Sequence, residues 1–277
     1  MPGPGRAKGE IDMGEKRRYR ALLLDIDGTL VHPGRRQPDR ATLQALEELR
    51  RRGVTVVLAT GRTLAAARPE VMGGFRPDHY ICINGAYVAA GDGQVLYHHP
   101  MSQRQFDDIL HLAQRESCPM GFAFSEGYYT YVGDETYRHY YREVNGDMVI
   151  LRDGTDGTRH LEGLPYAAFG ILPEARRAAF ADAALGLHLT AFDEDVYDIS
   201  QAGHTKASGA ARLLAATGID WGELVAVGDG ENDIELLEAA GLGVAMGNAP
   251  GHVKARADAV TGPVTGGGVL QVIREHF

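Results

Sequence analysis

The stretch Tyr19–Leu30, YRALLLDIDGTL, carries the strongest structural signal in the chain. Its apolar part stops at Asp25, and a short apolar run that ends at charged residues is typical of a buried β-strand. Residues two apart in an extended segment point to the same side, so the carboxylates of Asp25 and Asp27 are predicted to project together beyond the strand. Such close like charges are unfavourable unless a cation lies between them or one is protonated. The alternative interpretation is an ordinary turn, in which Asp and Gly are common.

A second group of carboxylates follows another apolar strand. Residues 228–233, GDGEND, come directly after LVAV and open a predicted helix. Asp229 or Asp233 could cap that helix, but capping accounts for only one acid. Two carboxylate-rich loops at the same edge of a sheet form a site for a hard cation, and oxygen ligands suit Mg²⁺. The spacing of these residues fits neither an EF-hand calcium loop nor a P-loop.

Two further segments carry groups suited to binding an anion. Thr60, Gly61 and Arg62 end a predicted strand, where a hydroxyl and the free N–H groups of a helix start can hold a phosphate oxygen. Lys206 begins another predicted helix, and its ordinary interpretation is a solvated surface lysine. However, the 28 basic residues comprise 24 Arg and only 4 Lys. This shortage of lysine favours an anion-pairing role for Lys206.

The order of the predicted elements indicates an α/β fold with a Rossmann-like parallel sheet. Apolar runs predict strands at 19–24, 54–59 and 80–83, and helical spacing predicts intervening helices at 38–52 and from about residue 63. The same alternation of helices and strands returns after Ser200.

The middle of the chain differs, because it carries hairpin signals. These surround Gly91-Asp92-Gly93 and Glu126-Gly127, with a predicted helix at 103–116 between them. Further strands are predicted at 166–172, 187–192 and 196–199, of which the last two are expected to pair. The expected division is a flexible tail at 1–18, a core at 19–85 and 199–277, and an inserted domain at 86–198.

The composition excludes several classes of protein. Of the 277 residues, 44% are hydrophobic and 23% charged, which excludes a wholly disordered chain. The net charge of −9 disfavours nucleic acids and anionic membranes as partners, because both attract basic surfaces. No apolar run approaches the roughly 18 residues of a membrane span, and residues 1–18 lack the apolar segment of a secretory signal. Cys82 and Cys118 cannot form a disulfide framework or a four-cysteine zinc site, so we expect a reducing cytoplasmic location.

Together these segments resemble the haloacid dehalogenase (HAD) superfamily, and in particular its Cof-type phosphatases with a large C2-type cap. Four segments match the family's motifs in the family's order: DIDGTL at 25–30, ATGR at 59–62, Lys206, and GDGENDIEL at 228–236. INGA at 83–86 and AMGNA at 245–249 also resemble family segments. The third motif departs from the usual Lys-Gly, because Ala207 follows Lys206. The resemblance implies a HAD core with an inserted α+β cap.

The resemblance also implies a mechanism and a role for each site residue. Asp25 would be the nucleophile that forms an aspartyl-phosphate, and Asp27 would protonate the leaving alcohol and then help to activate water. Mg²⁺ would be held by Asp25, the backbone carbonyl of Asp27 and Asp229, while Asp233 either binds the ion or orients its ligands. Four residues are expected to bind the phosphate or orient its ligands: Thr60, Gly61, Lys206 and Asn232.

The implied function is Mg²⁺-dependent hydrolysis of a small phosphorylated metabolite, with a sugar phosphate as the expected substrate. The cap would close over the site and select the leaving group, with Tyr128, Tyr129, Arg138 and Arg142 as candidate contacts. One alternative is a sugar phosphomutase or phosphotransferase of the same superfamily. Another is a non-catalytic phosphometabolite-binding module, which would need neither Asp25 nor Asp27. The sequence leaves open whether the protein is a monomer or a homodimer.

Overall fold

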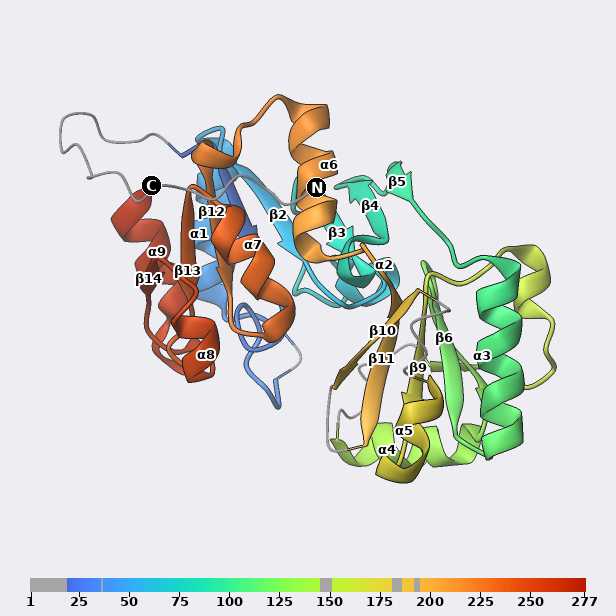
Figure 1. Ribbon diagram of the computed structural model, residues 1–277. Coiled ribbons are helices and arrows are strands. Elements are labelled where there is room, and N and C mark those ends of the chain that lie inside the picture. Colours follow the sequence, from blue (N-terminus) through green and yellow to red (C-terminus); the bar gives the residue numbers. More distant parts are fainter. Residues whose placement is uncertain (1–18, 36, 145–150, 181–185, 192–194) are drawn as a thin grey trace.

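The computed structural model (Figure 1) describes residues 19–35, 37–144, 151–180, 186–191 and 195–277. The expected tail at 1–18 and the side chain of Arg142 lie outside this description. In the described part, the chain forms two sheets, each covered by its own helices. No helix there is long and apolar enough to cross a membrane.

The main sheet has eight strands, and its central strand β1 (Ala21–Leu24) pairs in parallel with β12 and β2 on either side. The chain moves from β1 towards one edge and later returns to fill the other, so the strand order reverses between β1 and β12. Ligands bind at such a switch point, outside the carboxyl ends of the strands. Across the sheet, the other strands are β14 (Ala259–Val260), β13 (Leu242–Ala245), β12 (Leu224–Gly228), then β2 (Thr55–Ala59), β3 (His79–Cys82), β4 (Tyr87–Ala90) and β5 (Val95–His98).

Alternation along β1 explains why this strand is apolar throughout. Leu22 and Leu24 belong to the hydrophobic cluster on one face of the sheet, and Leu23 belongs to the cluster on the other. Helices α1 (Arg40–Arg51), α2 (Leu64–Ala67) and α9 (Gly268–His276) contribute to the first cluster, and α6 (Lys206–Thr217), α7 (Ile234–Ala239) and α8 (Gly251–Lys254) to the second. Short 3₁₀ turns complete this part: η1 (Ile83–Gly85), η5 (Trp221–Glu223), η6 (Glu231–Asp233) and η7 (Val264–Gly266). The predicted α/β fold is confirmed.

The hairpin of β4 and β5 extends the main sheet, since β4 pairs antiparallel with β3. The sequence-based boundary at residue 86 placed this hairpin in the insert. That position needs correction, because turn signals reveal a hairpin but not the sheet that it joins. At the other end, β11 (Val196–Gln201) lies in the second sheet and runs past the expected boundary at 198. We propose that the insert spans residues 99–201.

The second sheet has six strands, and helices cover the face that points away from the cavity. Side chains of α3 (Gln103–Glu116) and α5 (Glu174–Phe180) share a hydrophobic cluster with this sheet. The predicted pairing of β10 with β11 is confirmed, whereas α4 (Asp134–Val144) and β8 were not predicted. Across the sheet, the strands are β10 (Leu187–Ala191), β11, β9 (Ala167–Ile171), β6 (Met120–Phe124), β7 (Gly127–Val132) and β8 (Leu151–Asp153), and η3 spans Arg159–Glu162.

Two segments connect the two sheets, and they contact each other where they pass. The rings of His99 and His204 are stacked with their centroids 4.7 Å apart. The side-chain amide of Gln201 donates a hydrogen bond to the His99 carbonyl at 3.0 Å. These contacts tie the two connections together beside the main sheet.

Candidate active site

Carboxylates from two neighbouring strands meet at the switch point of the main sheet. Asp25 follows β1 and Asp229 follows β12, and these strands are parallel with Leu24 opposite Val227. Asp233 comes one turn later, at the end of η6. Oxygen atoms of Asp25, Asp229 and Asp233 all lie within 4.8 Å of one another. The two loops that the sequence pointed to are therefore together in space.

Lys206 is buried among these acids. Its side chain is 1% exposed, and its Nζ donates to Asp25 Oδ1 at 2.6 Å and to Asp233 Oδ1 at 2.7 Å. Burial alone would lower the pKa of Lys206, but the attraction of Asp233 and Asp25 outweighs it, and the net shift is upward. Burial raises the pKa of Asp25, and the Lys206 ammonium opposes that shift. Lys206 is thus a fixed internal cation, and its interpretation as a solvated surface lysine is excluded.

Glycines at two contact points allow Lys206 to reach this position. A Cβ on Gly85 would lie 2.2 Å from the Thr205 carbonyl oxygen, and one on Gly209 would lie 2.5 Å from Ile81 Cγ2. Helix α6 therefore packs directly on the turn that follows β3. Thr205 caps the helix, since its hydroxyl accepts from the N–H of Ser208 at 3.1 Å. This packing fixes the first turn of α6 behind Asp25.

Hydrogen-bond donors on both sides hold the carboxylate-rich loop at residues 228–233 in place. Thr29 Oγ1 donates to Asp229 Oδ1 at 2.8 Å, and the Asn248 amide donates to Asp229 Oδ2 at 3.1 Å. Asp233 Oδ2 accepts from the backbone N–H groups of Asp229 at 3.0 Å and Gly230 at 2.9 Å. Burial raises the pKa of Asp229 to about 6. Thr29 and Asn248 were not among the predicted site residues, although both stand in segments that match family motifs.

This donor set suits a hard divalent cation. Three carboxylates offer oxygen ligands only, which is the chemistry that Mg²⁺, Mn²⁺ and Ca²⁺ prefer. Gly28 lies against the same group with φ +86°, and a Cβ there would be 2.2 Å from Asp229 Oδ2. The absence of a side chain at Gly28 therefore leaves room for the Asp229 carboxylate.

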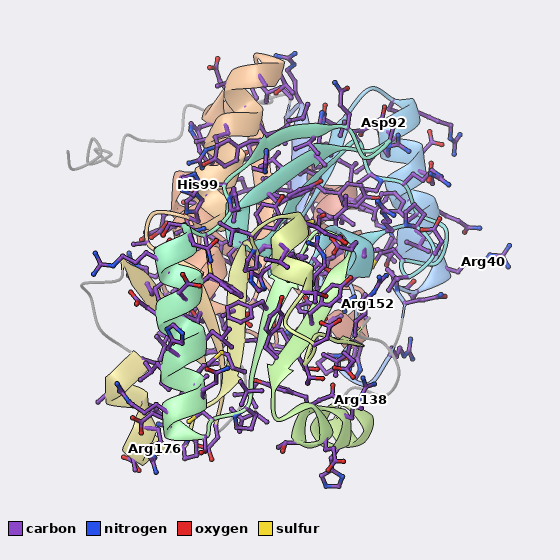
Figure 2. All side chains as sticks on the ribbon, turned by 90° about the vertical axis from the view of Figure 1, so that its right-hand side faces the viewer. Arg40, Asp92, His99, Arg138, Arg152 and Arg176 are labelled. Carbon is purple, nitrogen blue, oxygen red and sulfur yellow. The ribbon has the colours of Figure 1, made fainter. Side chains whose placement is uncertain are left out.

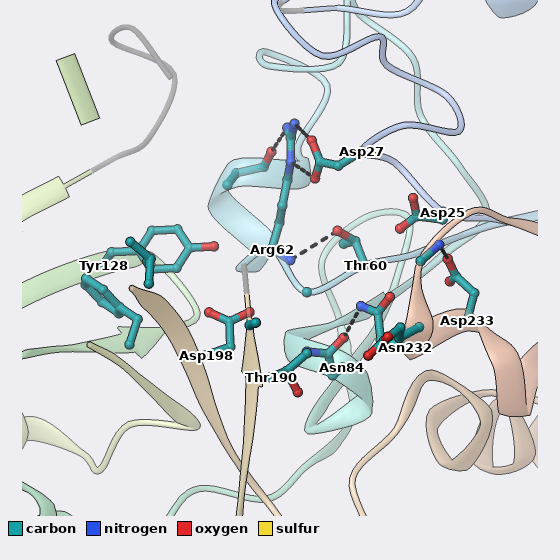
Figure 3. Close-up of a pocket in the computed structure, with 17 residues that line it drawn as sticks. Asp25, Asp27, Thr60, Arg62, Asn84, Tyr128, Thr190, Asp198, Asn232 and Asp233 are labelled. Atoms are coloured by element: carbon teal, nitrogen blue, oxygen red, sulfur yellow. Dashed lines mark hydrogen bonds and ion pairs between the residues drawn. The ribbon is translucent and has the colours of Figure 1, made fainter. Parts of the chain in front are cut away.

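Asp27 faces a different basic side chain (Figure 3). The guanidinium of Arg62 binds its carboxylate in a bidentate manner, with Nε donating to Asp27 Oδ2 at 2.8 Å. Arg62 also donates to the Ala66 carbonyl at 3.2 Å. The sequence left open whether a cation lies between Asp25 and Asp27 or one of them is protonated. In the structure, each carboxylate has its own basic partner, and the carboxylate of Asp27 lies outside the acidic group formed by Asp25, Asp229 and Asp233.

These residues open into a cavity of about 330 Å³ that both sheets line (Figure 3). The predicted phosphate ligands Thr60, Gly61 and Asn232 line it, whereas Lys206 lies behind its wall. Thr60 Oγ1 accepts from the backbone N–H of Arg62 at 3.1 Å. Residues from the main sheet and its loops include Asp25, Asp27, Thr60, Gly61, Arg62, Ala66, Asn84 and 230–233, and residues from the second sheet include Tyr128, Phe169, Thr190, Ala191, Val196 and Asp198.

Asn84 reaches the cavity through an unusual turn. Ile83 and Asn84 both have left-handed backbones, with φ of 50° and 48°. A β-branched residue such as Ile is strained there, and such strain gathers at functional sites. Asn84 Oδ1 accepts from the Asn232 amide at 3.0 Å, which fixes the predicted phosphate ligand Asn232. The INGA segment was the available signal for this residue.

Of the candidate cap contacts, Tyr128 lines the cavity. Its hydroxyl oxygen accepts from the Thr63 N–H at 3.2 Å. Tyr129 packs in the hydrophobic core of the second sheet. Arg138 pairs with Asp134 at 2.6 Å on α4, at the end of the insert away from the main sheet (Figure 2). Tyr129 and Arg138 do not line the cavity.

Comparison with known proteins identifies this arrangement. The profile of the haloacid dehalogenase-like hydrolase family matches residues 22–273. The chain belongs to this family. It is 28% identical to pyridoxal phosphate phosphatase YbhA of Escherichia coli, over 93% of this chain and 98% of that one. It is 30% identical to phosphoglycolate phosphatase of Methanopyrus kandleri, over 92% of this chain and 95% of that one.

Solved structures agree with this assignment. The HAD phosphatase BT1666 from Bacteroides thetaiotaomicron is similar with a TM-score of 0.82 and 27% identity, over 98% of this chain and 99% of that one. The subclass IIB sugar phosphatase BT4131 has a TM-score of 0.75 and 25% identity, over 92% and 98%. The predicted membership is confirmed: the protein is a HAD-type phosphatase of subclass IIB, Cof-type with a C2 cap, and acts on small phosphorylated metabolites.

The contact between Gly28 and Asp229 leads to a first prediction for this HAD phosphatase. We expect Gly28→Ala to lower phosphatase activity at least about tenfold, because the new methyl group displaces a candidate metal ligand. Gly34→Ala is the matched control, since Gly34 has a similar φ of +84° with no atom within 4 Å of its Cβ position. Both variants should lose about 1–2 kcal/mol of stability from the left-handed backbone. Equal activities of the two variants would contradict the prediction.

Proposed function

We propose that this HAD phosphatase hydrolyses a sugar phosphate with Mg²⁺ through an aspartyl-phosphate on Asp25. The observation that carries the proposal is the position of Asp25, which lines the cavity while Lys206 and the other acids surround its carboxylate. Similarity to a sugar phosphatase over nearly the whole chain supports the substrate class. The cavity volume lies in the range of small-molecule sites.

The proposed reaction has two steps. An Asp25 oxygen attacks phosphorus, the bond from phosphorus to the leaving oxygen breaks, and Asp27 supplies the proton that this oxygen takes up. Water then attacks the aspartyl-phosphate, Asp27 accepts its proton, and phosphate leaves with Asp25 regenerated. Arg62 holds the Asp27 carboxylate in place by donating to it, and a carboxylate so held can act as the acceptor of the second step. For the first step, we expect the substrate phosphate to draw Arg62 away, so that Asp27 can carry a proton.

Several groups are available to hold the transferring phosphate. In the proposal, the Thr60 hydroxyl, the Gly61 N–H and the Asn232 amide contact its oxygens from the cavity wall. Mg²⁺ would supply the positive charge that brings an anionic phosphate to an anionic nucleophile. Asp25, Asp229, Asp233 and the backbone carbonyl of Asp27 would hold it. Lys206 holds Asp25 and Asp233 in place through its two hydrogen bonds.

A phosphometabolite screen with Mg²⁺ tests this function, with inorganic phosphate as the readout. Release of phosphate from sugar phosphates is the expected result. Formation of an isomeric sugar phosphate without phosphate release would favour the phosphomutase alternative. Binding without any turnover would favour the non-catalytic module.

We also propose a reducing cytoplasmic location, which the two buried free thiols Cys82 and Cys118 support.

Removal of divalent metal gives a second prediction. Dialysis against EDTA should abolish activity, and Mg²⁺ should restore it and raise Tm, since at 100 times Kd a ligand stabilises by about 2.7 kcal/mol. In Asp229→Asn, the apparent Kd for Mg²⁺, obtained from the Mg²⁺-dependent rise in Tm, should be at least about tenfold higher than in the wild type. Asp92→Asn, in the exposed β4–β5 turn, is the control that should leave it unchanged. Full activity in the presence of EDTA would rule out the metal role.

A further inference from the structure

Asp198 lies at the centre of the cavity wall that the second sheet provides. It stands opposite Thr190 of β10 and Phe169 of β9 in the antiparallel register. Residues opposite each other on adjacent strands share a face, and all three line the cavity. Val196, two residues earlier on β11, lines it too, whereas Ile199 points into the helix-covered core. In Figure 3, Asp198 and Tyr128 lie across the cavity from Asp25 and Asp233.

The carboxylate of Asp198 has no hydrogen-bond or ion-pair partner in the part of the chain that the structure describes. Among the described residues, no donor lies within hydrogen-bond distance of its side chain and no cation pairs with it. Burial raises the pKa of Asp198 to about 6. The side chain is half-buried and lines the cavity, and a carboxylate that is partly desolvated without a donor is costly. A ligand that donates a hydrogen bond to Asp198 would relieve this cost.

The charges that line the cavity indicate which chemical groups such a ligand can carry. Among the described lining side chains, Arg62 is the only cation, and Asp27 already binds its guanidinium. The wall around Asp198 consists of a phenol, a phenyl ring, a hydroxyl and aliphatic groups. None of these described side chains carries a positive charge that could form an ion pair with a negative leaving group, whereas Asp198 can accept from hydroxyl or ammonium groups.

We propose that Asp198 selects substrates whose leaving group carries hydroxyl or ammonium donors, and that it rejects those bearing a carboxylate. This inference rests on the proposed phosphatase reaction and names the substrate class: phosphates of neutral polyols and of amino sugars. Thr190 and the Tyr128 hydroxyl flank Asp198 on the same wall and offer further polar contacts to such a leaving group. An unpaired buried acceptor discriminates strongly against a ligand that cannot satisfy it.

Three substrates with the same six-carbon skeleton and phosphate position test this selection. They are glucose 6-phosphate, which has a neutral leaving group, glucosamine 6-phosphate with an ammonium group, and 6-phosphogluconate with a carboxylate. We expect kcat/KM of the wild type for 6-phosphogluconate to be at least about tenfold below that for glucosamine 6-phosphate. In Asp198→Asn, the kcat/KM values for these two substrates should differ by about threefold or less. Asp195→Asn, which changes an acid paired with Arg177 outside the cavity, should keep the wild-type ratio.

A fourth substrate separates this inference from the proposed function. The leaving group of p-nitrophenyl phosphate offers Asp198 neither a hydroxyl donor nor an ammonium group, so Asp198→Asn should hydrolyse it at least as fast as the wild type does. No phosphate release from any of the four compounds would reject the proposed function. Turnover of p-nitrophenyl phosphate with no sugar phosphate used, or with a substrate ratio unchanged in Asp198→Asn, would overturn the role of Asp198 alone.

Discussion

Asp25→Asn is expected to abolish phosphate release, with kcat at least about 10⁴-fold lower than in the wild type. An amide oxygen is a poor nucleophile, and the variant cannot form the aspartyl-phosphate. The fold should survive, because the Asn side chain can still accept from Lys206, which also keeps its bond to Asp233. Phosphate release and Tm, both measured with Mg²⁺, check the two halves of this prediction.

Asp258→Asn is the matched control for this experiment. Asp258 is also a hydrogen-bond acceptor, for the N–H of Gly243 at 2.9 Å, but it is an exposed residue outside the cavity lining. Its amide variant should keep near wild-type activity. If Asp25→Asn retained more than about one hundredth of the wild-type kcat with an unchanged Tm, another group would have to be the nucleophile.

The meeting of the two acidic loops was predictable because it follows from local pattern and general topology. Apolar runs predict where β1 and β12 end, and parallel strands bring their carboxyl ends to the same edge. Asp25 and Asp229 therefore had to lie close together once both strands belonged to one sheet. Similarly, the spacing of apolar residues predicted α3 with its observed bounds.

The environment of each charge was not predictable, because it depends on contacts between distant segments. Lys206 is buried only because Gly85 and Gly209 let α6 approach the turn after β3, and neither glycine alone signals that approach. Which basic side chain pairs with Asp25 and which with Asp27 depends on side-chain geometry, and a sequence motif does not specify that geometry. Asp198 stands in an ordinary strand pattern, and only its register against Thr190 and Phe169 reveals the face that it shares.

Lys206→Met is expected to cause a large loss of stability. Removing the ammonium leaves Asp25 and Asp233 buried side by side, and breaking a buried ion pair by deleting one partner typically costs about 3–5 kcal/mol. For a protein of this size, we expect Tm in EDTA to fall by roughly 6–15 °C. Phosphatase activity should fall as well, because the candidate nucleophile loses the cation that lowers its pKa. Thermal unfolding in EDTA measures the loss of stability, and thermal unfolding with saturating Mg²⁺ measures how much of it the ion restores.

Mg²⁺ should restore much of the lost stability in Lys206→Met, since a dication among the same carboxylates replaces the missing positive charge. The Mg²⁺-induced rise in Tm should therefore be larger in this variant than in the wild type. Lys254→Met is the matched control. Among the described residues, Lys254 donates only to the Gly247 carbonyl, at 2.7 Å, so its loss should cost about 1 kcal/mol without any added response to metal. A Lys206→Met variant as stable as the wild type in EDTA would mean that the contacts of Lys206 with Asp25 and Asp233 do not stabilise the metal-free protein.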